Sequence, residues 1–219
     1  MLTEWTTDDG RHKRGVASSW LRRLRAAQSA IPLAGEGRGE VVGQTVEVFI
    51  RRSQFRLPKT LSTPMLWVGP GTGIAPFRSF WRDLQARVAA SDTATLDVTL
   101  YTGCRHQGID ELYQEELAAA KASGHLSGWH AAYSRDGPAK VYVQQLLDDD
   151  EIARVLAPNG TGILYVCGDA AGMAHDVHAK VVAVLASAHF GGNAQRAERF
   201  LSDTATKAGR YAKDVWFSM

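Results

Sequence analysis

The sequence has few cysteines and no long apolar run. Its 219 residues include only Cys104 and Cys167, which excludes a disulfide framework and favours a reducing compartment. The longest apolar stretch, VVAVLASA at 181–188, is far shorter than the roughly 20 residues that cross a bilayer. The opening MLTEWTTDDG is acidic and has no apolar core, so we expect no secretory signal. These absences predict a cytoplasmic protein.

An excess of charge of one sign is also missing. The chain has 25 Lys and Arg against 23 Asp and Glu, a formal net charge of +2, which is too small to indicate nucleic acid without a concentrated basic face. One basic segment, RHKRGVASSWLRRLR at 11–25, permits a nucleic-acid or membrane-surface arm. Solvated charges on a short helix explain it with fewer assumptions. We predict no nucleic-acid partner, and salt-dependent binding to DNA would be needed to reverse that prediction.

From residue 64 onward, short apolar runs alternate with helical patterns. This alternation is typical of parallel strands joined by crossover helices. It predicts an α/β fold, a doubly wound five-stranded parallel sheet with ligand at the carboxyl ends of the strands. The predicted strands are 65–68, 96–101, 129–133, 163–167 and a closing strand within 209–217. The predicted helices are 76–90, 110–122, 141–156, 172–188 and 193–207.

Residues 1–63 have a different pattern. A short basic helix is predicted after the serines of GVASSW, and a loop rich in glycine and charge follows at 34–40. The segment TVEVFIRRSQFRLP at 45–58 alternates in character and favours a strand that ends by Pro58. One helix and one or two strands cannot close a core. We therefore predict two domains, with 1–63 the end of a larger domain and 64–219 the α/β domain.

A glycine-rich loop joins the first predicted strand of the α/β domain to the helix that follows. The stretch MLWVGPGTGIAPFRSF at 65–80 contains Gly71, Thr72 and Gly73. Small residues between a strand and a helix N-terminus suit a phosphate, which would meet backbone amides and the Thr72 hydroxyl. The spacing matches neither the G-x-G-x-x-G fingerprint nor a P-loop. From the loop alone, phosphate binding and a simple tight turn both stay open.

Polar and basic residues follow the predicted strand 129–133. Ser134 and Arg135 come directly after it, and Lys140 and Tyr142 lie close to the start of the next predicted helix. Together they offer the groups that a dianionic phosphate requires. Because a ribose 2′-phosphate distinguishes NADPH from NADH, this set favours NADPH. A solvated loop with ordinary capping remains the alternative.

Several ordered motifs carry a family resemblance. GPGTGIAPFRSF, YTGCR, DELYQEEL, AYSRD, KVYVQ, YVCGDAAGMAHDV and GRYAKDVW together resemble the NADPH-binding half of the diflavin reductases, members of the ferredoxin-reductase superfamily. GRHKRGVASSWL and RRSQFRLP resemble the end of that family's FAD-binding barrel. The likeness extends from about residue 10 to residue 217. It implies a ferredoxin-reductase-like NADP-binding domain, preceded by the end of an incomplete antiparallel FAD-binding β-barrel.

The resemblance also implies roles for individual residues. The positions that match the FAD pyrophosphate contacts are Gly15, Val16, Ala17 and Ser18. Those that match the NADPH pyrophosphate loop are Gly71, Thr72 and Gly73. Those that match the adenosine and 2′-phosphate contacts are Ser134, Arg135, Lys140, Val141, Tyr142, Val143 and Gln144, with Asp176 as a further nucleotide contact. Those that match the catalytic region around the nicotinamide and flavin are Cys167, Asp214 and Trp216.

The implied catalytic roles are chemically reasonable. Hydride loss leaves the nicotinamide positively charged, so a nearby Asp214 carboxylate would stabilise it, while Cys167 would help to position the ring. Trp216 would cover the flavin and swing away for hydride transfer. A buried inert thiol at Cys167 and a hydrophobic plug at Trp216 are the structural alternatives. Tryptophan at this position favours the cytochrome P-450 reductase branch of the family. The residues after it, Phe217–Met219, form a C-terminal extension slightly longer than that branch is expected to have.

The expected function is hydride transfer from NADPH to FAD. In the intact parent, electrons would pass through an FMN domain to a haemoprotein such as cytochrome P-450, and the parent would be anchored to the endoplasmic reticulum by a segment outside this chain. The FMN domain and the Arg-x-Tyr-Ser motif of the FAD barrel are missing from the sequence. One alternative is a non-catalytic NADP(H)-binding fragment. Another is the same module from a sulfite reductase or nitric oxide synthase type enzyme. No metal is expected.

Overall fold

The chain divides into two compact units. These are residues 1–51 and 52–219. In the first unit, β1 (Glu4–Thr6) pairs antiparallel with β2 (His12–Arg14). The computed structural model describes residues 4–6, 9–14, 19–20, 22–23, 49, 53–90 and 96–217. Residues 15–18 lie outside this set, and so does half of the strand predicted at 45–58, namely 45–48 and 50–52.

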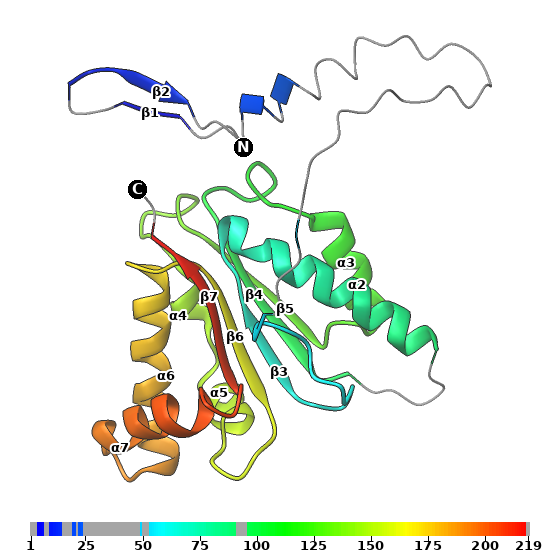
Figure 1. The fold of residues 1–219 in the computed structure, drawn as a ribbon, viewed down its shortest axis with the longest axis vertical. Helices are drawn as coiled ribbons and strands as arrows, with labels where there is room; N and C mark the ends of the chain where they lie inside the picture. Colours follow the sequence, from blue (N-terminus) through cyan, green and yellow to red (C-terminus); the bar gives the residue numbers. More distant parts are fainter. Residues whose placement is uncertain are drawn as a thin grey trace. The chain divides into compact units, whose positions relative to one another are not determined.

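The second unit is built on one parallel sheet. Its five strands follow the order β5-β4-β3-β6-β7, and every neighbouring pair is parallel (Figure 1). This order confirms the predicted doubly wound α/β fold. The strands are β3 (Met65–Val68), β4 (Val98–Cys104), β5 (Gly128–Tyr133), β6 (Ile163–Asp169) and β7 (Tyr211–Trp216).

Helices cover both faces of the sheet. The helices α2 and α3 lie on one face, and α4 to α7 lie on the other (Figure 1). The elements are a 3₁₀ turn η1 (Gly71–Ile74), α2 (Ala75–Ala89), α3 (Gln114–Ala122), α4 (Val143–Leu146), α5 (Asp149–Val155), α6 (Met173–His189), α7 (Ala194–Arg199) and a π-helical segment η2 (Phe200–Ala205). Within the described ranges, no helix is both long and apolar enough to cross a membrane.

The central strand β3 shows why the sheet is buried on both faces. All four of its residues are buried, and alternate side chains face opposite ways. Leu66 and Val68 belong to the core under α4 to α7, whereas Met65 and Trp67 belong to the core under α2 and α3. A continuous apolar run is therefore the pattern that this strand requires.

The segment that precedes β3 packs on the second unit. Phe55 contacts the rings of Phe77, Phe80 and Tyr165, with centroids 5.2 to 5.8 Å apart. The Tyr165 hydroxyl also donates a 2.7 Å hydrogen bond to the Arg56 carbonyl. Residues 53–58 contain no strand, so this part of the strand prediction is wrong. The aromatic contacts hold the segment in an irregular conformation.

Two predicted helices differ from the structure. The helix predicted at 141–156 is interrupted, because Leu147 is extended and the Asp148 carboxylate caps α5 by accepting the Glu151 N–H at 2.9 Å. The helix predicted at 110–122 begins only at Gln114, after Tyr113 with φ of 60°. In both cases a local backbone turn replaces helix that the apolar spacing alone allows.

Candidate functional site

A cavity of about 680 Å³ lies at the carboxyl ends of β3, β4, β5 and β6. Strands β3 and β6 are neighbours in the sheet, and the helices that follow them cover opposite faces. This is the switch point at which doubly wound sheets bind their ligands. The predicted site residues that line the cavity are Gly71, Ser134, Val141, Tyr142, Val143, Gln144 and Asp176.

The glycine loop forms one wall, and its conformation requires glycine. Gly71 has φ of +56°, a backbone conformation that is unfavourable for residues with a Cβ atom. A Cβ on Gly73 would collide with the Cys167 carbonyl oxygen and lie 2.9 Å from its carbon. The loop therefore packs directly on the backbone of β6. Thr72, which is exposed, follows Gly71 within η1, just before the N-terminus of α2.

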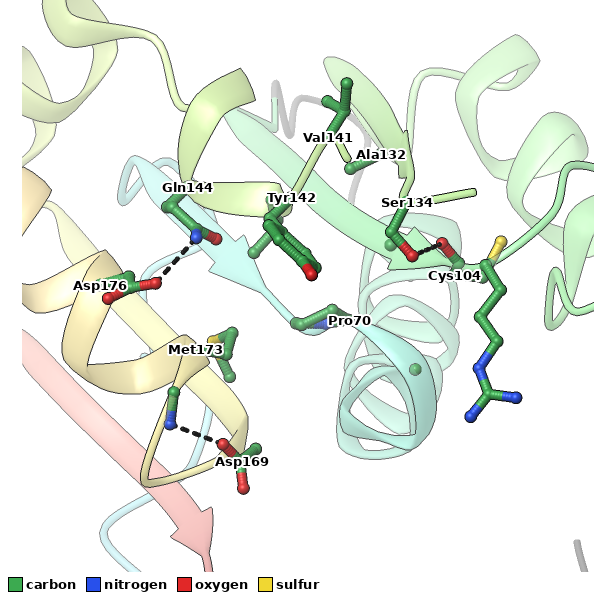
Figure 2. A pocket seen from close by; sticks show the side chains of 15 residues that line it. Pro70, Cys104, Ala132, Ser134, Val141, Tyr142, Gln144, Asp169, Met173 and Asp176 are labelled. Atoms are coloured by element: carbon green, nitrogen blue, oxygen red, sulfur yellow. Dashed lines mark hydrogen bonds between the residues drawn. The ribbon is translucent and has the colours of Figure 1, made fainter. Parts of the chain in front are cut away.

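The start of α4 forms the opposite wall. Tyr142 is extended, and its N–H donates a 2.7 Å hydrogen bond to the Gln145 side-chain oxygen. Two residues later, the Gln144 side-chain amide donates a 3.0 Å hydrogen bond to the Asp176 carboxylate on α6. Figure 2 shows this pair on one side of Tyr142 and Ser134 on the other. The Tyr142 side chain, 46% exposed, is available to contact a flat ligand group.

Backbone pairing continues beyond the ends of β4 and β5. The Ser134 N–H donates to the Cys104 carbonyl at 2.9 Å, and the Arg135 N–H donates to the Arg105 carbonyl at 2.9 Å. The Ser134 hydroxyl also donates a hydrogen bond to the same Cys104 carbonyl at 3.3 Å (Figure 2). These bonds place Arg105, which lines the cavity, beside the backbone of Arg135.

Three cations lie around this end of the sheet. In the part of the chain that the structure describes, the side chains of Arg105, Arg135 and Lys140 form no hydrogen bond or ion pair. Arg135 and Lys140 are exposed on the loop between Ser134 and Tyr142 and do not line the cavity themselves. The cations leave this end of the site suited to an anionic group.

The predicted catalytic residues form a second cluster, at the ends of β6 and β7. Cys167 pairs in register with Asp214, and Asp169 pairs with Trp216. The Ala170 N–H donates a 2.8 Å bond to the Trp216 carbonyl. None of the three predicted residues lines the cavity, but Asp169 does. The cluster therefore borders the cavity beyond its β6 side.

Cys167 and Trp216, two of the predicted catalytic residues, differ in how far they are buried. Cys167 is 2% exposed, and burial, with a smaller contribution from the Asp214 charge, raises the pKa of its thiol to about 12. It is therefore a neutral thiol at physiological pH. The Trp216 side chain is 42% exposed, so a large aromatic face is open at the end of β7.

Several cavity residues were not predicted. They are Pro70, Gly103, Cys104, Arg105, Ala132, Asp169, Gly172 and Met173. Arg105 was detectable, because it is a cation directly after the second strand of the sheet. Asp169 and Gly172 form a turn in which the Gly172 N–H donates to the Asp169 carboxylate at 2.7 Å. The predicted FAD contacts Gly15–Ser18 lie outside the described residues.

Comparison with known proteins identifies the family. A sequence model of the oxidoreductase NAD-binding domain matches residues 67–179, just over half of the chain. The chain belongs to this oxidoreductase family. It is 41% identical over 218 residues to NADPH–cytochrome P450 reductase of Oryctolagus cuniculus, 39% over 216 residues to that of Homo sapiens and 39% over 218 residues to that of Drosophila melanogaster. Each alignment covers 99% of this chain but 30% of the relative.

Proposed function

We propose that this chain is the NADPH-binding and hydride-transfer module of a diflavin reductase. Bound NADPH supplies a hydride, and FAD is its acceptor. The main support comes from Arg105, Arg135 and Lys140 beside a cavity at the switch point of the sheet. Their side chains form no ion pair with any other described residue. The cavity volume of about 680 Å³ falls within the range of small-molecule sites.

The adenosine end of the nucleotide is assigned to the β5–α4 loop. Arg135 and Lys140 would bind the 2′-phosphate, with the Ser134 hydroxyl as a further ligand, because charged donors suit a dianion. The exposed Tyr142 ring would pack on the adenine or its ribose. Gln144 is held by Asp176 at 3.0 Å, so its carboxamide is oriented at the same wall of the cavity. This arrangement selects NADPH over NADH through the phosphate.

The pyrophosphate is assigned to the glycine loop. The loop ends in η1 and runs directly into α2, a helix of 15 residues, whose N-terminus favours negative charge. Gly71 lines the cavity, and the hydroxyl of Thr72, which is exposed, would donate to a phosphate oxygen. The contact between Gly73 and β6 fixes the distance from this loop to Cys167.

The nicotinamide is assigned to the ends of β6 and β7. The neutral Cys167 thiol would position the ring, and the Asp214 carboxylate would stabilise the positive charge that develops as hydride leaves. The exposed Trp216 ring would cover the flavin between turnovers and move aside for the nicotinamide. The Ala170–Trp216 backbone bond fixes the main chain, so this motion is one of the side chain.

The N-terminal residues are assigned to a second domain of a larger protein. We propose that residues 1–63 are the end of an FAD-binding domain, with Gly15–Ser18 at the FAD pyrophosphate, and that 64–219 are the NADPH-binding domain. The similar reductases are about three times as long as the aligned region. In a protein of that size, an FMN domain would carry electrons to a haemoprotein such as cytochrome P-450. Attachment to the endoplasmic reticulum would then depend on a segment outside this chain.

Hydride transfer is tested by mixing the purified chain with FAD and then adding NADPH without oxygen. The expected result is loss of the oxidised flavin absorbance, with NADH acting much more slowly at the same concentration. The rate should exceed that of free FAD with NADPH, because the chain aligns the two rings.

A flavin spectrum that NADPH does not change, together with tight nucleotide binding, would contradict hydride transfer by this chain. That outcome would favour the non-catalytic NADP(H)-binding alternative. A module from a sulfite reductase or nitric oxide synthase type enzyme would give the same flavin reduction, and only its electron acceptor would differ.

A further inference from the structure

A single carboxylate joins the two loops at the outer rim of the cavity. The Asp136 side chain accepts a 2.7 Å hydrogen bond from His106 Nδ1 and a 2.8 Å hydrogen bond from the Gln107 N–H. Asp136 follows β5, whereas His106 and Gln107 follow β4. Each oxygen of the carboxylate therefore has a donor on the neighbouring loop.

This contact completes a series of links between the two loops. The backbone bonds from Ser134 to Cys104 and from Arg135 to Arg105 come first, and the side chain of Asp136 makes the next link to His106. The positions advance by one residue on each loop. Asp136 thus continues the parallel pairing where backbone bonds between the strands have ended.

Asp136 is a carboxylate beside two arginines in the sequence, and the neighbouring loop binds both of its oxygens. Hydrogen bonds from the Gln107 N–H and from His106 lower the pKa of Asp136, so it is ionised at neutral pH. It directly follows Arg135, and Arg105 directly precedes His106. A carboxylate released from these contacts would be available to pair with these neighbouring arginines. Instead, both arginines are without an ion-pair partner among the described residues.

Two further acidic side chains lie on this rim, and one of them is also held by hydrogen bonds. Glu111 accepts the Tyr133 hydroxyl at 2.8 Å and, more weakly, the Gly108 N–H at 3.4 Å. Asp110 is exposed on the β4–α3 connection. Asp136 is the acid adjacent in sequence to Arg135, so its orientation has the most direct effect on the phosphate-binding cation.

We propose that His106 is a specificity-determining positioning residue, which holds the Asp136 carboxylate on the β4–α3 loop so that Arg105 and Arg135 stay available to the 2′-phosphate of NADPH. This inference rests on the proposed function, because it concerns the same site. His106 does not touch the nucleotide. It acts by restraining an acid that would otherwise compete with the phosphate for the same cations.

The test compares the full chain with His106→Ala and with the double variant His106→Ala/Asp136→Asn. Calorimetric titrations at low salt measure the dissociation constants of 2′-phospho-AMP and AMP. His106→Ala should weaken 2′-phospho-AMP binding about two- to fivefold, the range that one exposed ion pair contributes, and leave AMP unchanged. Adding Asp136→Asn should restore 2′-phospho-AMP binding, because the released side chain no longer carries a charge.

The control variant is His125→Ala. His125 contacts Ser123 at 2.6 Å in the loop before β5, at the opposite end of the sheet, and its removal should change neither affinity. A double variant that binds 2′-phospho-AMP as weakly as His106→Ala, or equal losses for AMP and 2′-phospho-AMP, would overturn the inference in favour of a purely structural contact. A wild-type chain that binds both nucleotides equally would overturn the proposed function itself.

Discussion

Replacing Arg135 with alanine is expected to weaken NADPH binding by about 10- to 100-fold and to leave NADH binding nearly unchanged. Only NADPH loses a hydrogen bond between charged groups, and such bonds contribute about 1.5–3 kcal/mol. The Arg135 side chain has no competing ion pair within the described residues, so its full charge is available to the phosphate. Calorimetric titration with NADP⁺ and NAD⁺ measures both affinities on the same sample.

A matched control separates this effect from a general loss of positive charge. Arg82 lies on α2, is 62% exposed and is 4.0 Å from Glu116. The Arg82→Ala variant removes one cation far from the β5–α4 loop, and its NADP⁺ affinity should match that of the wild type within twofold, as expected for a screened surface charge. Equal weakening of NADP⁺ and NAD⁺ by Arg135→Ala would refute the assignment of Arg135 to the 2′-phosphate.

Gly73→Ala is expected to destabilise the second unit and to impair cofactor binding. The new Cβ would overlap the Cys167 carbonyl and approach the Gly168 Cα at 3.3 Å. These are backbone atoms that cannot rotate away, so the loop or β6 must shift. Overpacking of this kind costs roughly 1–3 kcal/mol, which urea unfolding measures. The same shift moves the glycine loop away from its position beside Cys167.

Gly137→Ala is the control for this prediction. A Cβ at Gly137 would meet only the Ala139 carbonyl oxygen, at 3.7 Å, which is ordinary contact. Its free energy of unfolding should stay within about 0.5 kcal/mol of the wild-type value, as is usual for surface substitutions. If Gly73→Ala were equally stable, the tight packing between the glycine loop and β6 would not be a requirement of the fold.

The sheet was predictable because its strands are buried on both faces. The run MLWV at 65–68 coincides with β3, since a central parallel strand needs apolar side chains on each side. The long helix predicted at 172–188 corresponds closely to α6 (Met173–His189). Both patterns lie within a short stretch of the chain, so they can be recognised from one sequence.

Departures from the predicted elements come from local backbone features that periodicity does not record. The apolar spacing at 141–156 continues across Leu147, yet the Asp148 cap starts a new helix there. At Tyr113 the backbone adopts φ of 60° before α3 begins. In each case the backbone conformation of one or two residues ends or delays the helix.

The candidate site was predicted in part. The residues after β5 and at the start of α4 came together with the glycine loop, because parallel strands deliver their following loops to one edge. Arg105 and the His106–Asp136 pair were not predicted. His106 and Asp136 are 30 residues apart, and their contact depends on the register of β4 with β5. No spacing within the sequence records that register.

In the proposed function, the cavity at the carboxyl ends of β3, β4, β5 and β6 binds NADPH, and the cations beside it recognise the 2′-phosphate. The most direct measurement is a pair of calorimetric titrations of the unmodified chain, one with 2′-phospho-AMP and one with AMP. We expect 2′-phospho-AMP to bind at least tenfold more tightly than AMP, because only this ligand engages the cations of the β5–α4 loop. Equal affinities, or no binding of either nucleotide, would contradict it.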